Sequence, residues 1–450
     1  MALMAILLLR CSHLTIGLLI RYNANNSKDL QDVYLEGRGR LMSEFEHHLD
    51  KYAELIVKVG VNVQQGQEVF ITGAVDNATL VRLVASNAYA AGASNVHVDW
   101  TDDSLSRLKY EKAADDIFTR YPEWETAKRN SFVERGAAFI SIVSSSPDLL
   151  KGIDSGRISN FQKASGQGLK EFRRAIQADK VSWTVVAAAS KQWAAKVFPE
   201  AGEEAVELLW KAIFDSVRLH AEDPVKAWEE HNATLHTKGE ILNKNRFKKL
   251  HYTAPGTDLT IELPENHIWV AAGSTNVSNV PFMANMPTEE VFTVPLKTGV
   301  NGYVSSTKPL SYGGNIIDRF KLTFENGRIV KVEAEEGQEI LQQLVDIDEG
   351  SHYLGEVALV PHESPISQSN ILFYNTLFDE NASNHLAIGS GYAFNIEGGK
   401  NMSPEELEAS GVNASITHND FMIGSAEMDI DGILSDGTVV PVFRKGNWAI

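Results

Sequence analysis

The chain has 450 residues, of which 43% are hydrophobic and 22% are charged, and these values exclude disordered and collagen-like proteins. Its 59 acidic residues outnumber its 41 basic ones. The resulting net charge of −18 repels phosphate backbones, so we expect no nucleic-acid partner and a soluble, cytoplasmic protein. Cys11 is the single cysteine. Thiolate zinc sites and iron–sulfur clusters are therefore excluded, and a bound metal would need oxygen and imidazole ligands.

Residues 1–41 differ in character from the rest of the chain. They include two apolar runs, residues 2–9 and 14–20, which are both shorter than the roughly 20 residues of a membrane-spanning helix. The runs also lack the basic start and the small-residue cleavage site of a signal peptide. Because Met42 opens an amphipathic stretch, we interpret residues 1–41 as the product of a mis-assigned start and expect no membrane association.

The N-terminal half predicts an α/β domain with a parallel sheet. Short buried-strand patterns alternate with amphipathic segments, and strand, helix and strand follow one another within about thirty residues, as in a βαβ unit. Nucleotide-binding glycine motifs do not follow any of these strands. The predicted helices cover residues 46–59, 78–91, 169–178 and 203–219, and the predicted strands cover residues 67–72, 96–100, 137–143 and 181–189.

A polar and charged stretch, residues 221–245, indicates a domain boundary. We therefore predict an N-terminal domain over residues 42–235 and a C-terminal catalytic domain over residues 236–450. Period-two alternation then predicts an α+β fold rich in antiparallel sheet, with a hairpin turn at Glu325-Asn326-Gly327 and one helix over residues 338–345. The predicted strands cover residues 259–263, 290–294, 320–324, 329–333, 354–360 and 421–430.

His418 and Asp420 are the first candidate metal ligands. They lie two residues apart in a strand-like segment, so both side chains face the same side. An imidazole beside a carboxylate suits a divalent zinc, cobalt or manganese ion. A simple His–Asp hydrogen bond at a strand edge would explain the same pattern.

Three further acids and a histidine stand in unusual surroundings. Glu356 interrupts an apolar strand, where a buried carboxylate would need a cation, although the position could also face solvent. Glu380 and His385 lie in a predicted loop that enters a tight turn, and a helix cap would explain them equally well. Glu290 alternates with Phe292 after a proline turn and points opposite to its neighbour Glu289, and it could also be a charged strand start.

Together these segments supply four carboxylates and two imidazoles, the number that two divalent ions with a shared carboxylate and a bridging water require. Such a site hydrolyses amides. The candidate ligands are Glu290, Glu356, Glu380, His385, His418 and Asp420. A metal-dependent amidase for non-peptide amides and a non-catalytic peptide-binding protein remain alternatives.

Four long segments resemble one known family, the thermophilic-type metalloaminopeptidases, which include aminopeptidase T, aminopeptidase S and PepS. The resemblance extends from about Met42 to Ile450. It rests on PFMANMPTEEVFT, LGEVALVPHESPISQS, LFDENASNHLAIGSGY and THNDFMIGS.

This resemblance implies an aminopeptidase that releases N-terminal residues from peptides with a free N-terminus. It implies two divalent metal ions per chain, zinc, cobalt or a similar ion, and a cytoplasmic homodimer. By the same resemblance Glu356 bridges both ions, the other five candidates complete the ligand set, and Tyr392 is the active-site tyrosine. Residues 1–41 have no counterpart in the family.

Overall fold

The computed structural model describes residues 44–312 and 315–450, so the predictions for residues 1–41 lie outside its described part. The chain divides into two compact units, residues 1–49 and residues 50–450. Helix α2 (Glu44–Leu55) is followed by a π-helical turn (Ile56–Gly60), and together they form the first predicted helix. Of the described residues, only residues 44–49, the start of α2, belong to the first unit, and all the others belong to the second.

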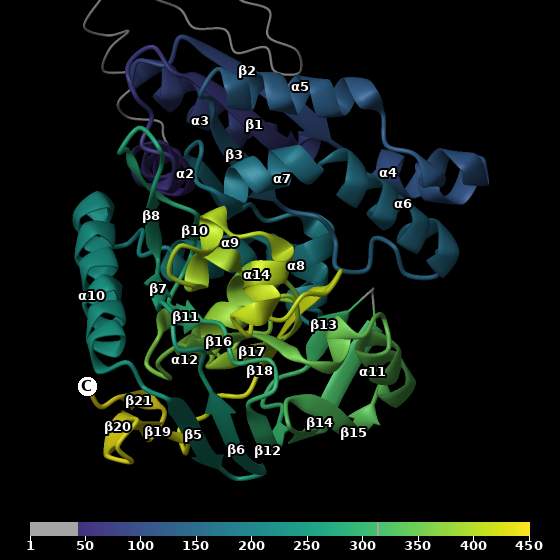
Figure 1. The fold of residues 1–450 in the computed structure, drawn as a ribbon. Coiled ribbons are helices and arrows are strands. Elements are labelled where there is room, and N and C mark those ends of the chain that lie inside the picture. Colours follow the sequence, from purple (N-terminus) through teal and green to yellow (C-terminus); the bar gives the residue numbers. More distant parts are fainter. Residues whose placement is uncertain (1–43, 313–314) are drawn as a thin grey trace, which may run out of the picture. The chain divides into compact units, whose positions relative to one another are not determined.

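A parallel sheet with the strand order β10-β4-β3-β1-β2 organises the first part of this unit (Figure 1). Helix α3 (Ala78–Ala90) joins β1 to β2 and packs against both, which is the βαβ unit that the sequence predicts. Strand β10 (Asn285–Met286) was not predicted, since it comes from the C-terminal half and pairs with β4 at Val185 and Val186. The other strands are β1 (Glu68–Ala74), β2 (Asn95–Thr101), β3 (Ala138–Val143) and β4 (Trp183–Ala187).

Most of the helices belong to this part of the chain. The predicted helices over residues 169–178 and 203–219 correspond to α7 and α9. The helices after α3 are α4 (Asp103–Lys112), α5 (Glu123–Glu134), α6 (Ser155–Gly168), α7 (Lys170–Gln177), α8 (Lys191–Val197) and α9 (Ala205–Ser216).

The polar stretch over residues 221–245 forms α10 (Pro224–Asn245), a single helix of 22 residues that Asp223 caps. Its buried residues are Trp228, Leu235, Gly239 and Leu242, whose spacings of seven, four and three positions place them on one narrow face. The polar remainder of the helix explains why the sequence suggested a boundary there. The division into domains 42–235 and 236–450 stays a prediction.

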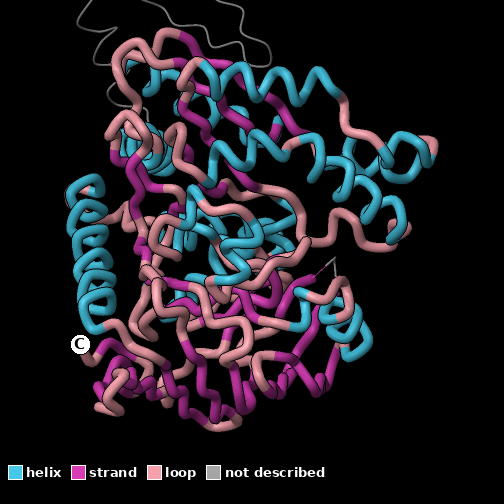
Figure 2. Tube along the Cα trace, viewed as in Figure 1, coloured by secondary structure: helices cyan, strands magenta, loops and turns pink. Residues whose placement is uncertain are grey.

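A nine-stranded antiparallel sheet forms much of the C-terminal half, where strands predominate in Figure 2. The turn at Asn326-Gly327 joins β14 and β15 as predicted, with positive φ at both residues, and α11 (Gln338–Val345) is the predicted helix. The strands are β5 (Lys249–Ala254), β6 (Thr257–Glu262), β12 (Val300–Ser305), β13 (Leu310–Tyr312), β14 (Asn315–Glu325), β15 (Arg328–Glu336), β19 (Asp429–Ile433), β20 (Val439–Arg444) and β21 (Asn447–Trp448).

A second antiparallel sheet, with the strand order β18-β17-β16-β11-β7, lies within the main apolar core. All residues of β16 and β17 are buried, so both faces of these strands are covered. We call this the site sheet. Its strands are β7 (Val270–Ala271), β11 (Val291–Thr293), β16 (Leu354–Leu359), β17 (His385–Gly389) and β18 (His418–Met422).

The predicted strand over residues 421–430 is wrong, because the chain leaves the site sheet after β18 and enters the nine-stranded sheet at β19. Gly424 lies in the connection, where an added Cβ would come within 2.7 Å of the Ser383 hydroxyl oxygen. The turn at Gly424 therefore packs too closely for a side chain, and the alternation of apolar and polar residues on either side concealed it.

The remaining elements are short connections. They comprise the small β8–β9 hairpin and three helices near the site sheet. Their bounds are β8 (Gly273–Thr275), β9 (Pro281–Met283), α12 (Pro365–Ser369), α13 (Thr376–Asp379) and α14 (Pro404–Ala409). None of the helices within residues 44–312 and 315–450 has both the length and the apolar composition of a bilayer span.

Candidate metal centre

One face of the site sheet collects the predicted side chains. Directly opposed residues of an antiparallel ladder point to the same face. Glu356 of β16 lies opposite Ala387 of β17, which in turn lies opposite Asp420 of β18. The two carboxylates therefore share a face, and the small Ala387 between them leaves space above the sheet.

The same register brings the other candidates to this face. His385 precedes Ala387 by two residues and His418 precedes Asp420 by two, so both imidazoles point the same way. Phe292 pairs with Ala358, which pairs with His385, and this pairing extends the face to β11. Glu290 lies two residues before Phe292 and follows the same alternation. His385 begins a buried strand, so the predicted loop at this position is wrong.

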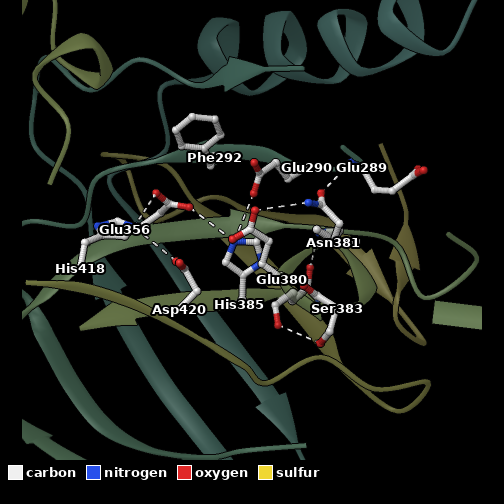
Figure 3. A network of polar contacts seen from close by, with 12 residues as sticks. Glu289, Glu290, Phe292, Glu356, Glu380, Asn381, Ser383, His385, His418 and Asp420 are labelled. Carbon is white, nitrogen blue, oxygen red and sulfur yellow. Dashed lines mark hydrogen bonds and ion pairs between the residues drawn. The ribbon is translucent and has the colours of Figure 1, made fainter. Parts of the chain in front are cut away.

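The ring nitrogens and carboxylate oxygens lie close together (Figure 3). His385 Nε2 is 3.1 Å from Glu290 Oε2 and 3.4 Å from Glu356 Oε1. His418 Nε2 is 3.3 Å from Asp420 Oδ1 and 3.6 Å from Glu356 Oε2. These contacts define two triads, Glu290–Glu356–His385 and Glu356–His418–Asp420, each with its donor atoms within 4.8 Å of one another. Glu356 belongs to both.

Glu380 and Tyr392 border the same cavity as Glu290, Glu356 and Asp420. Glu380 begins a 3-10 turn (Glu380–Ala382) and belongs to neither triad. The Tyr392 ring is centred 4.8 Å from the His418 ring and stacks on Phe394. The structure thus brings all seven predicted side chains together, and their roles remain predictions.

Backbone carbonyl oxygens contact the Nδ1 atoms of both imidazoles and so fix the orientation of the rings. His385 Nδ1 lies 3.1 Å from the Ser383 carbonyl oxygen, and His418 Nδ1 lies 2.7 Å from that of Ser390. An Nδ1–H that donates to a carbonyl leaves Nε2 as the free nitrogen. In both residues Nε2 faces carboxylates, which is the arrangement that orients a metal-binding histidine.

Three atoms of this cluster that could ligate a metal are buried, and none of them has a hydrogen-bonding partner within the described residues. They are Glu290 Oε2, His385 Nε2 and Asp420 Oδ1. Buried acceptors cost free energy unless a donor or a cation satisfies them. Since all three atoms face the same space, the residues fit a divalent cation of the type that oxygen and nitrogen ligands bind.

Burial and crowding disfavour ionisation of the acids and of the tyrosine. The pKa of Glu356 is raised by burial, and that of Glu380 is raised further by burial together with the charges of Asp420 and Glu290. Burial and the same carboxylates raise the pKa of Tyr392 well above its ordinary value. Tyr392 therefore keeps its phenolic proton at neutral pH and can donate a hydrogen bond.

The imidazoles respond in the opposite direction. Burial alone would lower their pKa values, but the carboxylates of Glu290 and Glu356 raise the pKa of His385, and Asp420 raises that of His418 to about 9. For Asp420, which is an acid, burial acts in the other direction and would raise the pKa, but the neighbouring His418 lowers it below its ordinary value. The carboxylates therefore favour the protonated, positively charged forms of the His385 and His418 imidazoles.

Glu289 points away from the cluster, as the alternation predicts, but it is also buried. Its carboxylate pairs with the Arg218 guanidinium at 2.7 Å, and His231 lies 3.5 Å away. The Glu289 backbone N–H donates to Asn381 Oδ1 at 2.7 Å. Sequence analysis missed Arg218 and Asn381 as supports of the Glu290 segment. Arg218 lies 71 residues before Glu289, so no local pattern connects the two. Asn381 offered a signal only as the neighbour of the candidate ligand Glu380.

Asp348 anchors the segment that leads into β18. Its Oδ1 accepts from the Ser415 hydroxyl at 2.7 Å and from the Ser351 N–H at 2.8 Å, and its Oδ2 accepts from the Ile416 N–H at 2.8 Å. Burial alone would raise the pKa of Asp348, but these hydrogen bonds lower it below its ordinary value. The ionised carboxylate thus stabilises the approach to His418.

We expect Asp348→Asn to lower the free energy of unfolding at pH 7 by about 1 kcal/mol, because charged acceptors are lost. The folded-state pKa lies below that of the unfolded chain. The contribution is therefore present above about pH 4 and disappears as the pH falls through the folded value. Urea unfolding at pH 7 and at about pH 3 tests this, with the exposed Asp346→Asn as the control. An equal loss at both pH values would contradict it.

The cavity in front of the cluster has a volume of about 480 Å³. Side chains of the site sheet and of helix α7 line it, so residues from distant parts of the sequence meet there. Its volume lies within the roughly 300–1,000 Å³ of small-ligand sites.

Comparisons with known proteins agree with this site. Residues 45–448 match the family model described as thermophilic metalloprotease (M29). The chain is 62% identical over 409 residues to aminopeptidase AmpS of Bacillus subtilis, covering 91% of this chain and 100% of that protein. It is 41% identical over 410 residues to aminopeptidase T of Thermus aquaticus, with coverage of 91% and 100%. The structure of wild-type AmpT from Thermus thermophilus superposes with a TM-score of 0.85 at 40% identity, covering 90% of this chain and 100% of that one.

A buried set of carboxylates and imidazoles, in a chain this similar to aminopeptidases, defines a metalloaminopeptidase, a hydrolase of peptide bonds that uses a divalent metal. The chain belongs to the thermophilic metalloprotease family, M29. The predicted family resemblance, enzyme class and combination of parallel and antiparallel sheets are confirmed.

Proposed function

We propose that the enzyme hydrolyses the N-terminal peptide bond of peptides at a site for two divalent ions, zinc, cobalt or manganese. The observation that supports two ions is the membership of Glu356 in both triads. Glu356 would ligate both ions, Glu290 and His385 one of them, and His418 and Asp420 the other. Glu380 would complete the set from the edge of the cavity.

Charge balance also supports two ions. Glu290, Glu356, Glu380 and Asp420 carry four negative charges when all are ionised, and two divalent cations would neutralise them while leaving both imidazoles neutral. A single divalent ion would balance only two of these charges, and protons on the acids or the imidazoles would have to balance the other two. Uncompensated buried charge is strongly unfavourable, so the two-ion arrangement is the better match to the residues present.

When bound, such ions polarise a carbonyl oxygen and lower the pKa of a water held between them. The protein's own groups would handle the proton and the developing charge. Glu356 or Glu380 would move the proton to the departing amine, and Glu380 is the better placed because it lies outside both triads. Tyr392, which keeps its proton, would donate to the tetrahedral oxyanion.

Selection of a free N-terminus follows from the same acids. A substrate's free α-amine would hydrogen-bond to the carboxylates on one side of the site, where Glu290 and Glu380 line the cavity. An N-acetylated peptide lacks that amine and adds bulk at this end of the site. We extend the proposal to a cytoplasmic homodimer in which residues 236–450 form the catalytic domain and residues 42–235 the α/β domain.

Removal of the metal tests the proposal. Chelation should lower hydrolysis of a free-amine peptide at least about a hundredfold, since metal catalysis supplies several kcal/mol, and cobalt, zinc or manganese should restore it. We expect restoration to saturate at two ions per chain, measured by metal analysis alongside initial rates.

The matched N-acetylated peptide is the specificity control. The proposal requires that the reloaded enzyme leave it uncleaved. Equal hydrolysis of both peptides, or cleavage of simple non-peptide amides in preference, would indicate a general amidase. Saturation at one ion per chain would contradict the two-metal site.

A further inference from the structure

Helix α7 (Lys170–Gln177) turns one stripe of side chains toward the candidate site. Phe172, Arg173, Ile176 and Gln177 line the cavity that also contains Glu290, Glu356, Glu380 and Asp420. Their spacing places them on one side of the helix, since residues four apart lie above one another. Phe172 and Ile176 also pack against the apolar cluster of the parallel sheet, which holds α7 in this orientation.

Arg173 is the unusual member of this stripe. Within residues 44–312 and 315–450 its guanidinium has no hydrogen bond and no ion pair. The other basic side chain away from the triads, Lys400, is already paired with Asp179 at 2.7 Å. Arg173 therefore brings an unpaired positive charge to a cavity that acids also line. A guanidinium presents paired N–H donors that match a carboxylate.

We propose that Arg173 binds the C-terminal carboxylate of short peptide substrates, so that the cavity recognises both ends of a peptide. The inference rests on the proposed aminopeptidase function. The candidate metal site would hold the substrate's N-terminal amine, and the guanidinium on α7 would attract its carboxylate. An extended residue spans about 3.3–3.6 Å, so only a short peptide can satisfy both ends within a cavity of this volume.

The positive charge of Arg173 differs in sign from the net charge of the protein, and this difference matters for the binding of a carboxylate. A net charge of −18 repels an incoming carboxylate, and the cavity is lined by five acids, of which Asp179 is paired with Lys400. Arg173 supplies the local counter-charge. Because Arg173 is exposed, the interaction is solvent-screened and its effect on affinity is moderate.

The next residue, Arg174, provides a matched control. It is also exposed, also lies on α7 and also has no ion pair within the described part of the chain, but it does not line the cavity. Arg173→Gln and Arg174→Gln therefore remove the same charge from neighbouring positions. General electrostatic effects should be equal in both variants.

The experiment compares free-acid and C-terminally amidated peptides from the dipeptide to the pentapeptide, with one N-terminal residue throughout. For the wild type we expect a KM about three- to tenfold lower for the free acid at one or two lengths, as expected of a screened arginine–carboxylate pair. Arg173→Gln should abolish this preference and Arg174→Gln should retain it. Added salt should weaken the preference in the wild type.

Several outcomes would overturn the inference. They are a wild-type enzyme that shows no free-acid preference at any length, a preference that survives Arg173→Gln, and a preference that Arg174→Gln removes equally. An amidated peptide with a C-terminal glutamate that binds better than the free acid would assign the guanidinium to side chains instead, and would also overturn it. Failure of the wild type to cleave any member of the series would contradict the proposed function itself.

Discussion

Glu356→Gln should lower kcat by at least about a thousandfold, because metal and electrostatic contributions of several kcal/mol depend on this one carboxylate. Glu356 belongs to both triads, and its two oxygens face His385 and His418 separately. Glutamine keeps the size of the side chain but removes its charge and one acceptor. No other residue of the two triads is shared, so this substitution should affect both ions.

The fold should survive Glu356→Gln. Burial raises the pKa of Glu356, so the fold does not depend on its ionised form in the absence of a cation. We expect an unchanged far-UV spectrum, a reduced metal content and a lost activity. The exposed Glu339→Gln on α11 is the control, with wild-type kcat expected. A Glu356→Gln enzyme with near wild-type kcat and two bound ions would contradict the assignment.

Arg218→Met should lower the free energy of unfolding by about 3–5 kcal/mol, the range seen when one partner of a buried ion pair is removed. The Glu289 side chain is only 3% exposed, and the Arg218 guanidinium contacts both of its carboxylate oxygens, at 2.7 and 2.9 Å. Methionine leaves that carboxylate buried without its cation. Glu289 immediately precedes Glu290, so the variant should also bind metal more weakly.

Two controls separate the buried charge from other causes. Arg218 and Arg319 both have a positive φ and both pair with a carboxylate, but the pair of Arg319 with Glu335 is exposed, so Arg319→Met should leave the free energy of unfolding nearly unchanged. The double variant Arg218→Met with Glu289→Met should recover most of the lost stability, since no charge is left unpaired. Urea unfolding of these three variants and the wild type tests the argument, and a double variant as unstable as Arg218→Met would contradict it.

Local pattern was sufficient for the regular elements. The βαβ unit from β1 to β2 and the turn at Asn326-Gly327 each depend on residues within about thirty positions, where alternation, helical spacing and positive φ act directly on the backbone. The same reasoning placed His418 and Asp420 on one face of a strand, and β18 confirms it.

Local pattern failed where long-range packing overrode it. Residues 421–430 alternate apolar and polar side chains closely enough to suggest one strand, but Phe421 and Met422 belong to β18 and Asp429 and Ile430 to β19, with a turn between them. His385 stands among short polar residues and was placed in a loop, but β16 and β18 pair on either side of it and make a strand. Strand β10 has only two residues, and only its pairing with β4 defines it.

The donor set is a property of the amino-acid sequence. With one cysteine, a large excess of acids and acids set in apolar segments, the chemistry could only be that of oxygen and nitrogen ligands, whatever the fold. The sequence also implies which neighbours share a face, since alternation along a strand is local. The family resemblance named the same residues.

Whether the candidate ligands come together, by contrast, depends on the register between strands. Pairing of Glu356 with Ala387, and of Ala387 with Asp420, places the carboxylates across one small side chain, and a slip of a single residue would turn every ligand of a strand to the opposite face. That pairing makes Glu356 common to both triads, and it brings Arg173 on α7 into the same cavity as acids more than a hundred positions away. Contacts between distant segments depend on the packing of the whole sheet, which no local pattern contains.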